Sequence, residues 1–295
     1  MRGPERGFLL LSSRLGDPER KPLTTAQLRV LADRSWKLDL PAFQRELEEK
    51  DLLALGYGQN MAQKILGLLS QEDVLEHYLT RGKRAGCVPL TRVSQGYPLQ
   101  LRRRLGLESP GVLWAKGDLS ILEGKKLAVV GSRDLNPQNR SFAEEAGRQA
   151  ALQGYTLVSG NARGADRCAQ ESCLLHGGRV ISVVADELAR HSQRKNVLYL
   201  SEEDFDCDFS AQRALSRNRV IHALGDKTVV CQSSLGMGGT WDGTVKNLFH
   251  GWSDVFCYDD GSDAARRLEQ MGAILIDLRQ LRELSGLTGD QNFLR

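Results

Sequence analysis

From residue 125 onward, short apolar runs rich in β-branched residues alternate with stretches of helical periodicity. This alternation is the pattern of parallel strands joined by crossover helices. The runs are apolar almost throughout, as expected of strands that are covered on both faces. Strands are predicted at 127–130, 156–158, 180–184, 197–200, 228–231, 255–258 and 273–276, and helices at 141–153 and 166–175. The sequence therefore predicts an α/β fold, an extended Rossmann-like parallel sheet with helices on both faces.

The sequence before residue 125 has a different pattern of apolar residues. Apolar residues at spacings of three and four between residues 24 and 84 predict helices, one of them starting at 39–41. A segment rich in Pro, Gly and Arg follows, with one short strand expected at 112–115. We therefore expect a small helical domain over 1–85, a connecting segment over 86–124, the Rossmann-like domain over 125–280 and a C-terminal tail over 281–295.

Residues 52–58, Leu-Leu-Ala-Leu-Gly-Tyr-Gly, followed by Met61, Ala62 and Ile65, resemble a helix-hairpin-helix. Two glycines allow the tight turn of such a hairpin, and the backbone N–H groups of its second helix point at a phosphate. A glycine-containing connector between two helices, with no ligand, has the same pattern. The sequence leaves both interpretations open.

Ligands of an open parallel sheet bind outside the carboxyl ends of its strands, so the loops there hold the candidate site. Glycines in these loops let a phosphate approach the backbone, hydroxyl groups donate hydrogen bonds, and helix starts add positive partial charge. The candidate phosphate-binding residues are Gly131, Ser132, Arg133, Ser159, Gly160, Arg163, Gly164, Arg217, Asn218, Arg219, Gly239 and Thr240.

Four of these candidates are arginines, whose planar guanidinium groups suit phosphate oxygens. The formal net charge of the chain is only +3, so a basic site must come from local clustering of such residues. Pairing of Arg163 with Asp166, or of Arg219 with Asp226, would instead give these two arginines a structural role.

Several classes of chemistry find no support in the sequence. Residues 131–136 do not follow the dinucleotide-binding pattern of glycines, and the phosphate-loop lysine pattern is missing. The six cysteines form no CxxC pair and the five histidines are scattered, so we expect no metal site, no cofactor and no catalytic residue. The apolar run at 8–11 is too short for a signal peptide or a membrane span. We expect a cytoplasmic protein without a membrane partner.

Taken together, these segments resemble the DprA/Smf family, the DNA-processing proteins of bacterial transformation. Residues 129–133 match the family's strand followed by Gly-Ser-Arg. Residues 159–166 match Ser-Gly-x-Ala-Arg-Gly-x-Asp at every fixed position, and 217–221 match Arg-Asn-Arg-x-Ile. Shorter matches occur at 97–98, 110–117 and 201–202, so the resemblance covers about residues 96–260.

The resemblance implies a Rossmann-like domain that forms a homodimer and binds single-stranded DNA in a basic pocket. It also implies a role in DNA uptake and recombination, through protection of the strand and loading of the RecA recombinase. The residues that it places in the pocket are Arg133, Arg163, Arg217 and Arg219, with Ser132, Gly160 and Asn218 beside them.

The chain departs from the family pattern at several positions. Residues 186–190 replace a Gly-x-Gly stretch that ends in Tyr-Pro, and Gln232 replaces an acidic residue. Residues 238–244 replace a Ser-Gly-x-x-x-Thr-Ala loop, and we expect no winged helix after Ile276. Within this loop Trp241 is a candidate for stacking a base, with burial against the sheet as the alternative.

Two other functions use the same fold. Residues 235–242 come near the Pro-Gly-Gly-x-Gly-Thr-x-x-Glu motif of the nucleotide-monophosphate phosphoribohydrolases, without its Pro and Glu. That reaction needs an acidic group, for which only Asp242 or Asp166 is available. The other function is a sensor that binds a small nucleotide in the same pocket.

Overall fold

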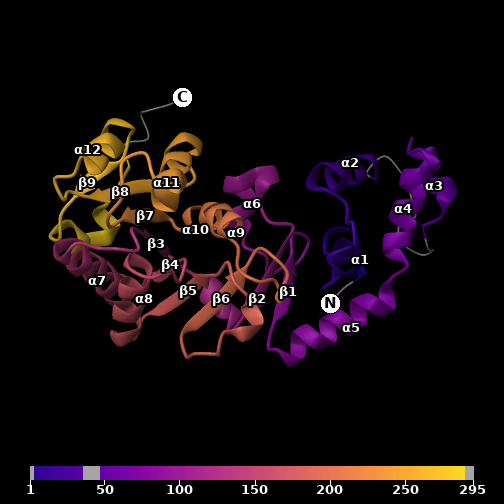
Figure 1. Cartoon of the computed structure of the whole chain (residues 1–295), viewed down its shortest axis with the longest axis horizontal. Helices are drawn as coiled ribbons and strands as arrows, with labels where there is room; N and C mark the ends of the chain where they lie inside the picture. The colour runs from indigo at the N-terminus through magenta and orange to yellow at the C-terminus, as the bar shows by residue number, and fades with distance from the viewer. Residues whose placement is uncertain (1–2, 36–46, 290–295) are drawn as a thin grey trace.

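The computed structural model describes residues 3–35 and 47–289. In this part of the chain one nine-stranded sheet has the order β1-β2-β6-β5-β4-β3-β7-β8-β9 (Figure 1). The pairs from β6 to β9 in this order are parallel. All seven predicted strands of the Rossmann-like region are present and the α/β fold is confirmed: β3 (Lys126–Val130), β4 (Thr156–Ser159), β5 (Arg179–Val183), β6 (Val197–Ser201), β7 (Lys227–Val230), β8 (Asp254–Tyr258) and β9 (Ile274–Ile276).

The segment 86–124 is more than a connection, because it extends the sheet. It contributes β1 (Val88–Thr91) and β2 (Val112–Lys116), which pair antiparallel with each other, and β2 pairs antiparallel with β6. The predicted strand at 112–115 is thus confirmed, whereas β1 was missed. Pro89 obscures β1 in the sequence, and a proline is tolerated there because β1 is an edge strand. The division of the chain into the four expected domains stays a prediction.

Helices cover both faces of the sheet. On one face lie α7 (Pro137–Leu152), α8 (Ala165–Leu175) and the 3₁₀ segment Gln280–Gly286, and their apolar side chains pack with Leu127 and Val129 of β3. The alternate residues of β3, Ala128 and Val130, belong to the core of the other face. That face is covered by α6 (Leu99–Leu105), α10 (Asn218–Leu224), α11 (Gly238–His250) and α12 (Asp263–Gln270).

The predicted helix boundaries shift slightly. α7 begins four residues before the predicted 141, because Pro137 occupies its first turn, where a missing N–H costs nothing. Of the predicted tail, Leu281 and Leu284 are buried against α7, so its first part belongs to the domain core. Residues 290–295 of the tail lie outside the described residues.

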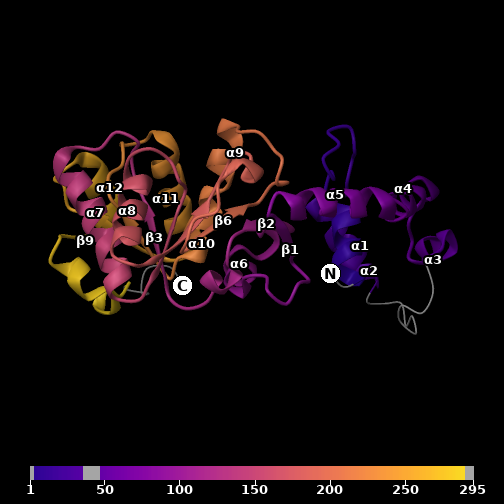
Figure 2. The same cartoon turned by 90° about the horizontal axis from the view of Figure 1, so that it is seen from below.

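The N-terminal helices are α1 (Gly3–Ser12), α2 (Thr25–Ser35), α3 (Glu49–Ala54), α4 (Gln59–Leu69) and α5 (Glu72–Arg84). They enclose a small core of Leu23, Leu52, Ala62, Ile65 and Leu68. α5 runs from this group of helices to the sheet (Figure 2). The helix start expected at 39–41 lies outside the described residues.

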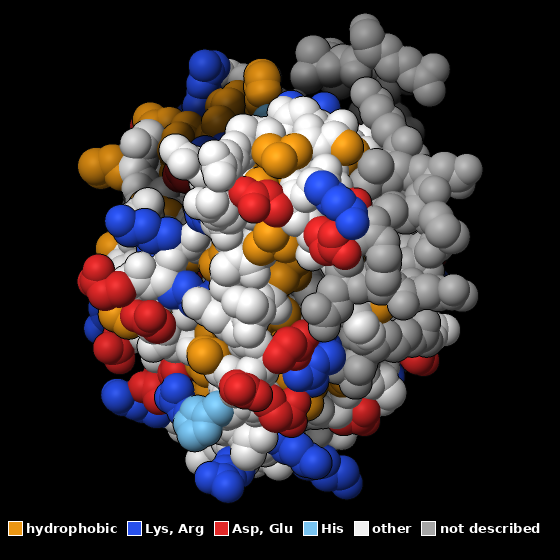
Figure 3. All heavy atoms as spheres, turned by 90° about the vertical axis from the view of Figure 1, so that its right-hand side faces the viewer, with side chains coloured by type: hydrophobic (Ala, Val, Ile, Leu, Met, Phe, Trp, Pro, Cys, Tyr) orange, Lys and Arg blue, Asp and Glu red, His pale blue; other side chains and the backbone are white. Residues whose placement is uncertain are grey.

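The predicted turn between α3 and α4 is present. Gly56 has a φ of 81°, and Gly58 is the extended residue before α4. On the outer face of this region, basic and acidic side chains are interspersed (Figure 3). The turn geometry fits both the hairpin and the connector without a ligand, so a contact with phosphate stays a prediction.

Buried aromatic rings join the N-terminal helices to the sheet. The Tyr78 ring of α5 lies 5.6 Å from the Trp114 ring and 4.8 Å from the Phe205 ring, measured between centroids. Asp204 accepts a hydrogen bond of 3.3 Å from the Trp114 indole, and Asp206 accepts one of 2.7 Å from the Tyr78 hydroxyl. Burial is the main cause of a raised pKa at Asp204. This joint holds α5 firmly against β2.

None of the helices in the described ranges is both long and apolar enough to cross a bilayer.

Candidate nucleic-acid interface

The chain order reverses at β3, because β4 lies on one side of it and β7 on the other. Such a switch point is where an open sheet binds its ligands. The loops after β3, β4 and β5, together with the segment before α10, enclose a hollow of about 520 Å³. We call this hollow the arginine pocket after four of its lining residues, Arg133, Arg163, Arg167 and Arg217.

Arg217 forms the floor of the arginine pocket. It is 7% exposed, and its guanidinium lies so close to Gly160 that any side chain at residue 160 would displace it. Burial lowers the pKa of Arg217, and the neighbouring Asp166 carboxylate opposes that shift. An arginine still keeps its proton under these conditions. Its Nε has no hydrogen-bond partner among the described residues, although the carboxylates of Asp166, Asp186 and Glu202 act on its charge.

Asp166 shapes the loop above Arg217. Its carboxylate accepts hydrogen bonds from the backbone N–H groups of Gly160, at 3.0 Å, and Ala162, at 3.2 Å. Burial raises the pKa of Asp166, and the charge of Arg217 acts in the opposite direction. The alternative in which Asp166 pairs with Arg163 is therefore wrong, because this carboxylate is occupied elsewhere.

Arg163 lies at the rim of the pocket. It pairs instead with Asp134, at 2.7 Å, and the two side chains are 71% and 83% exposed. An ion pair this exposed contributes little to stability, so Arg163 is free to exchange its partner for a phosphate. Arg133 and Arg167 are also exposed.

Glycines bring the loops after β3 and β4 into contact. Gly164 has a φ of 87°, and a Cβ there would collide with the carbonyl groups of Ser132 and Arg133. A Cβ at Gly131 would likewise collide with the side chain of Ala165, the first residue of α8. The backbone N–H of Ala165 donates a hydrogen bond of 3.1 Å to the Ser132 carbonyl. The N-terminus of α8 thus lies beside the Ser132–Arg133 backbone and adds positive partial charge to the pocket.

Other predicted site residues have structural contacts. Ser159 is fully buried, and its hydroxyl accepts a hydrogen bond of 2.6 Å from Gln170. The Ser132 hydroxyl accepts one of 3.2 Å from the backbone of Asp134. Thr240 lies half-buried in the first turn of α11, and it lines neither the arginine pocket nor the larger hollow beside α11.

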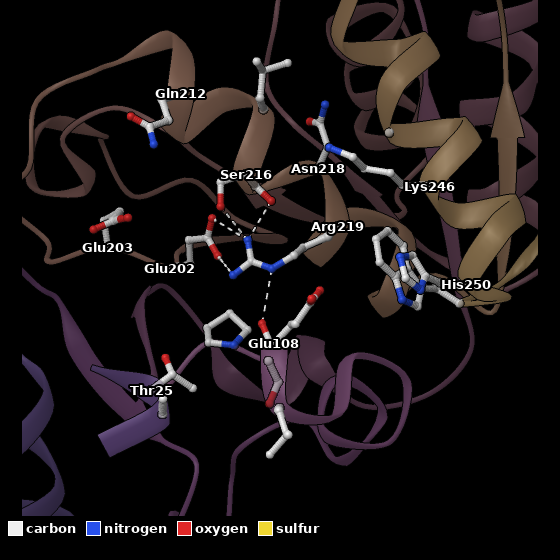
Figure 4. Close-up of a pocket in the computed structure, with 18 of the residues that line it drawn as sticks. Thr25, Glu108, Glu202, Glu203, Gln212, Ser216, Asn218, Arg219, Lys246 and His250 are labelled. Atoms are coloured by element: carbon white, nitrogen blue, oxygen red, sulfur yellow. Dashed lines mark hydrogen bonds and ion pairs between the residues drawn. The ribbon is translucent and has the colours of Figure 1, made fainter. Parts of the chain in front are cut away.

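Arg219 faces a second hollow of about 1470 Å³, between α2, the segment 107–111, and α11 (Figure 4). Its guanidinium pairs with Glu202 at 2.7 Å and donates to the carbonyl groups of Ser216, at 2.7 Å, and Glu108, at 3.2 Å. The alternative pairing with Asp226 is wrong, since Asp226 lies beside Arg104, at 3.9 Å.

We call this second hollow the mixed groove, because acidic side chains outnumber basic ones along it. Its charged lining residues are Arg29, Asp33, Glu108, Glu202, Glu203, Arg219, Asp242 and Lys246. Asn218 also lines it and donates a hydrogen bond of 3.0 Å to the Gly239 carbonyl. The structure thus brings Arg133, Gly160, Arg163 and Arg217 together, and separates Asn218, Arg219 and Gly239 from them.

Several pocket residues were missed by sequence reasoning. Arg167 follows the 159–166 motif by one residue, which was a usable signal. Asp186 and His191 come from the segment that departs from the family pattern; their side chains are 2.9 Å apart, and this hydrogen bond lowers the pKa of Asp186. Phe209 also lines the pocket, and no sequence pattern marks it. Gln232 also differs from the family pattern. Its side chain accepts a hydrogen bond of 3.0 Å from the backbone of Asn136 and so stabilises the loop after β3.

Neither acid that could serve a phosphoribohydrolase is free in the arginine pocket. Asp166 is committed to the backbone of its own loop, and Asp242 lines the mixed groove, where it pairs with Lys246 at 2.8 Å. His222 is buried and hydrogen-bonded to Asn247, and burial lowers its pKa to about 3. Within residues 3–35 and 47–289, no cluster of three His, Cys, Asp or Glu side chains is arranged to hold a metal ion.

Comparison with known proteins places these features in a family. The model of the family described as DNA recombination-mediator protein A matches residues 89–263. The DNA processing protein DprA of Bacillus subtilis is 28% identical over 171 residues, which cover 54% of this chain and 55% of that protein. Protein Smf of Escherichia coli is 29% identical over 199 residues, covering 62% and 52%. The chain spans about half the length of these curated relatives.

Solved structures share the fold. The DNA processing protein A of Streptococcus pneumoniae superposes with a TM-score of 0.71 at 24% identity, over 90% of this chain and 94% of that one. DNA processing protein A of Helicobacter pylori, whose structure is described as showing a single-stranded DNA binding mode, gives a TM-score of 0.56 at 22% identity, over 67% and 94%. Because the family model matches more than half of its residues, the chain belongs to the DprA/Smf family, whose model is described as DNA recombination-mediator protein A.

Proposed function

We propose that the arginine pocket binds the phosphates of single-stranded DNA, and that the protein acts on such strands in the cytoplasm. The observation that carries this proposal is the buried Arg217 guanidinium, whose Nε has no partner among the described residues. Arg133, Arg163 and Arg167 line the same hollow and add three exposed positive charges. Arginine binds phosphate through paired, charge-assisted hydrogen bonds, and neutralised phosphates release counterions.

The depth of the pocket favours a single strand over a duplex. Arg217 is buried, whereas Arg133 and Arg163 are exposed at the rim. A flexible strand can bend to bring one phosphate down to Arg217 while its neighbours stay at the rim. A stiff duplex presents its phosphates on a convex surface and contacts the rim alone.

The wider role follows the family. We propose that the protein acts in DNA uptake and recombination, protects single strands, and helps to load RecA, with a homodimer as the acting form. This proposal is supported by the family's description as a recombination mediator and by the DNA-processing names of its relatives.

The test is a titration of a fluorescent poly-dT strand across a salt series, with a duplex of the same length as comparison. The single strand is expected to bind more tightly, with log K falling against log salt by roughly 0.7 per contacted phosphate. Excess nucleoside monophosphate, added as competitor, should leave the bound strand in place. If neither DNA binds at low salt, or if the monophosphate displaces the strand at micromolar concentration, a small-nucleotide site replaces the proposed function.

A further inference from the structure

Phe209 is an exposed aromatic side chain in a pocket otherwise rich in charge. It lies between β6 and α9 (Ala211–Ser216), is 58% exposed, and lines the arginine pocket with Arg163 and Arg217. The residue after it, Ser210, caps α9 by accepting a hydrogen bond of 3.1 Å from the backbone of Arg213. The ring is therefore attached to a fixed helix start, although most of its surface faces water.

Other aromatic rings nearby already have partners. Trp241, the stacking candidate from the sequence, is half-buried and packs with Val245 and Leu248 against the core. The His191 ring lines the pocket but stacks on the Tyr199 ring, with 4.8 Å between centroids. Among the described residues that line the pocket, Phe209 is the aromatic side chain whose ring is left open to a ligand.

We propose that Phe209 is a stacking platform for a base of the strand whose phosphates contact the arginines. This inference rests on the proposed function and names what the pocket selects. Bases stack on aromatic rings irrespective of their sequence, because every base has a flat π face. The ligand is therefore a polyanion that carries unstacked bases, which a bare polyphosphate lacks. In a duplex the bases are stacked on one another, so they cannot reach the ring.

The charged side chains that line the arginine pocket favour nucleic acid over a protein partner. The arginine pocket has four arginines and one carboxylate, Asp186, so it attracts a polyanion. The apolar side chain of Leu215, on the helix α9 that follows Phe209, is 48% exposed and lines the mixed groove instead. Leu215 thus offers a matched control: an exposed apolar side chain of α9 that lies outside the arginine pocket.

The experiment compares Phe209→Ala, Phe209→Trp and Leu215→Ala with the wild-type chain. Each protein is titrated with a fluorescent dT strand and with a strand of equal length that carries abasic residues. The wild-type protein should bind the dT strand roughly tenfold more tightly than the abasic strand, the size of one stacked base. Phe209→Ala should lose that factor and bind both strands alike, with an unchanged salt slope. Phe209→Trp should restore the factor, and Leu215→Ala should leave it unchanged.

Several outcomes overturn the inference while the proposed function survives. If Phe209→Ala still binds the dT strand more tightly than the abasic strand, or loses the same factor of affinity for both strands, the ring does not stack a base. If the variant changes the molecular mass in size-exclusion chromatography with light scattering and keeps its preference, Phe209 contacts a second copy instead. Failure of the wild-type protein to bind either strand contradicts the proposed function itself.

Discussion

The arginine pocket and the mixed groove are lined by different residues of the segment Arg217-Asn218-Arg219, and their charges differ. Arg217 ends α9 and precedes α10, and it lies buried beneath exposed arginines with one acidic neighbour in the lining. Arg219, two residues later, is held by Glu202 in a groove where acids predominate. We therefore propose that the two arginines of this motif serve different purposes, Arg217 in binding a ligand and Arg219 in stabilising the fold. We expect variants of Arg219 to lose stability and variants of Arg217 to lose affinity for DNA.

The largest expected effect is on stability, at Arg219. Arg219→Ala leaves the carboxylate of Glu202, only 5% exposed, without its partner at 2.7 Å. Breaking such a pair lowers the free energy of unfolding by about 3 kcal/mol. Urea denaturation should show this loss, while the folded variant binds the dT strand within about twofold of wild type, less than 0.5 kcal/mol. A variant of wild-type stability, or one with strongly reduced affinity, would show that the two hollows are not distinct in function.

The next effect is on binding, at Arg217. Arg217→Gln removes the buried charge but keeps a side chain that can donate a hydrogen bond to the loop. Loss of a charge-assisted phosphate contact costs about 2 kcal/mol, which lowers affinity for the dT strand roughly 30-fold. Fluorescence anisotropy measures this, with circular dichroism to show that the variant is folded. Unchanged affinity in a folded variant would remove Arg217 from the interface.

A smaller effect is expected at the rim. Arg163→Ala removes an exposed arginine that pairs with Asp134, so stability should not change measurably. For this variant, log K for the dT strand should fall less steeply with log salt, by roughly 0.7, the value for one phosphate contact with a single strand.

Arg266→Ala is the matched control for the rim, because Arg266 is an exposed arginine of α12 with a weak ion pair of 4.0 Å. Its salt slope should equal that of the wild-type protein. Equal slopes for all three proteins would mean that Arg163 contacts no phosphate.

The smallest effect is a pH dependence at the joint between the N-terminal helices and the sheet. Burial raises the pKa of Asp204 in the folded protein, so the folded state binds a proton that the unfolded state releases. Asp204 therefore makes stability fall as pH rises from about 3.9, its unfolded pKa, to the raised value. In Asp204→Asn this fall should be smaller.

Urea denaturation at several pH values measures the slope, with Asp208→Asn as the control, since Asp208 is an exposed acid of the same segment. If Asp204→Asn and the wild-type protein lose stability in parallel over this range, Asp204 does not titrate with a raised pKa in the folded state.

The sheet could be predicted because its strands are continuous β-branched runs, whose burial on both faces leaves no polar alternation to confuse the pattern. β1 could not, since it is short, lies at an edge and contains Pro89. The loops that carry Arg133, Arg163 and Gly160 follow predicted strands, so sequence reasoning placed them at one edge of the sheet. Arg217 and Arg219 line different hollows because of the junction of α9 with α10, which no linear pattern reveals. Phe209 lies in an irregular segment, where exposure of a ring is a property of the fold alone.

We propose above all that DNA occupies the arginine pocket and not the mixed groove. The most direct measurement is photo-cross-linking of a single strand that carries 4-thiothymidine, followed by mass spectrometry of the cross-linked peptides. If DNA occupies the arginine pocket, cross-links should form to the loop that contains Arg163 and to the segment that contains Phe209. Cross-links confined to Lys246, His250 or Trp252, which line the mixed groove, would contradict this proposal.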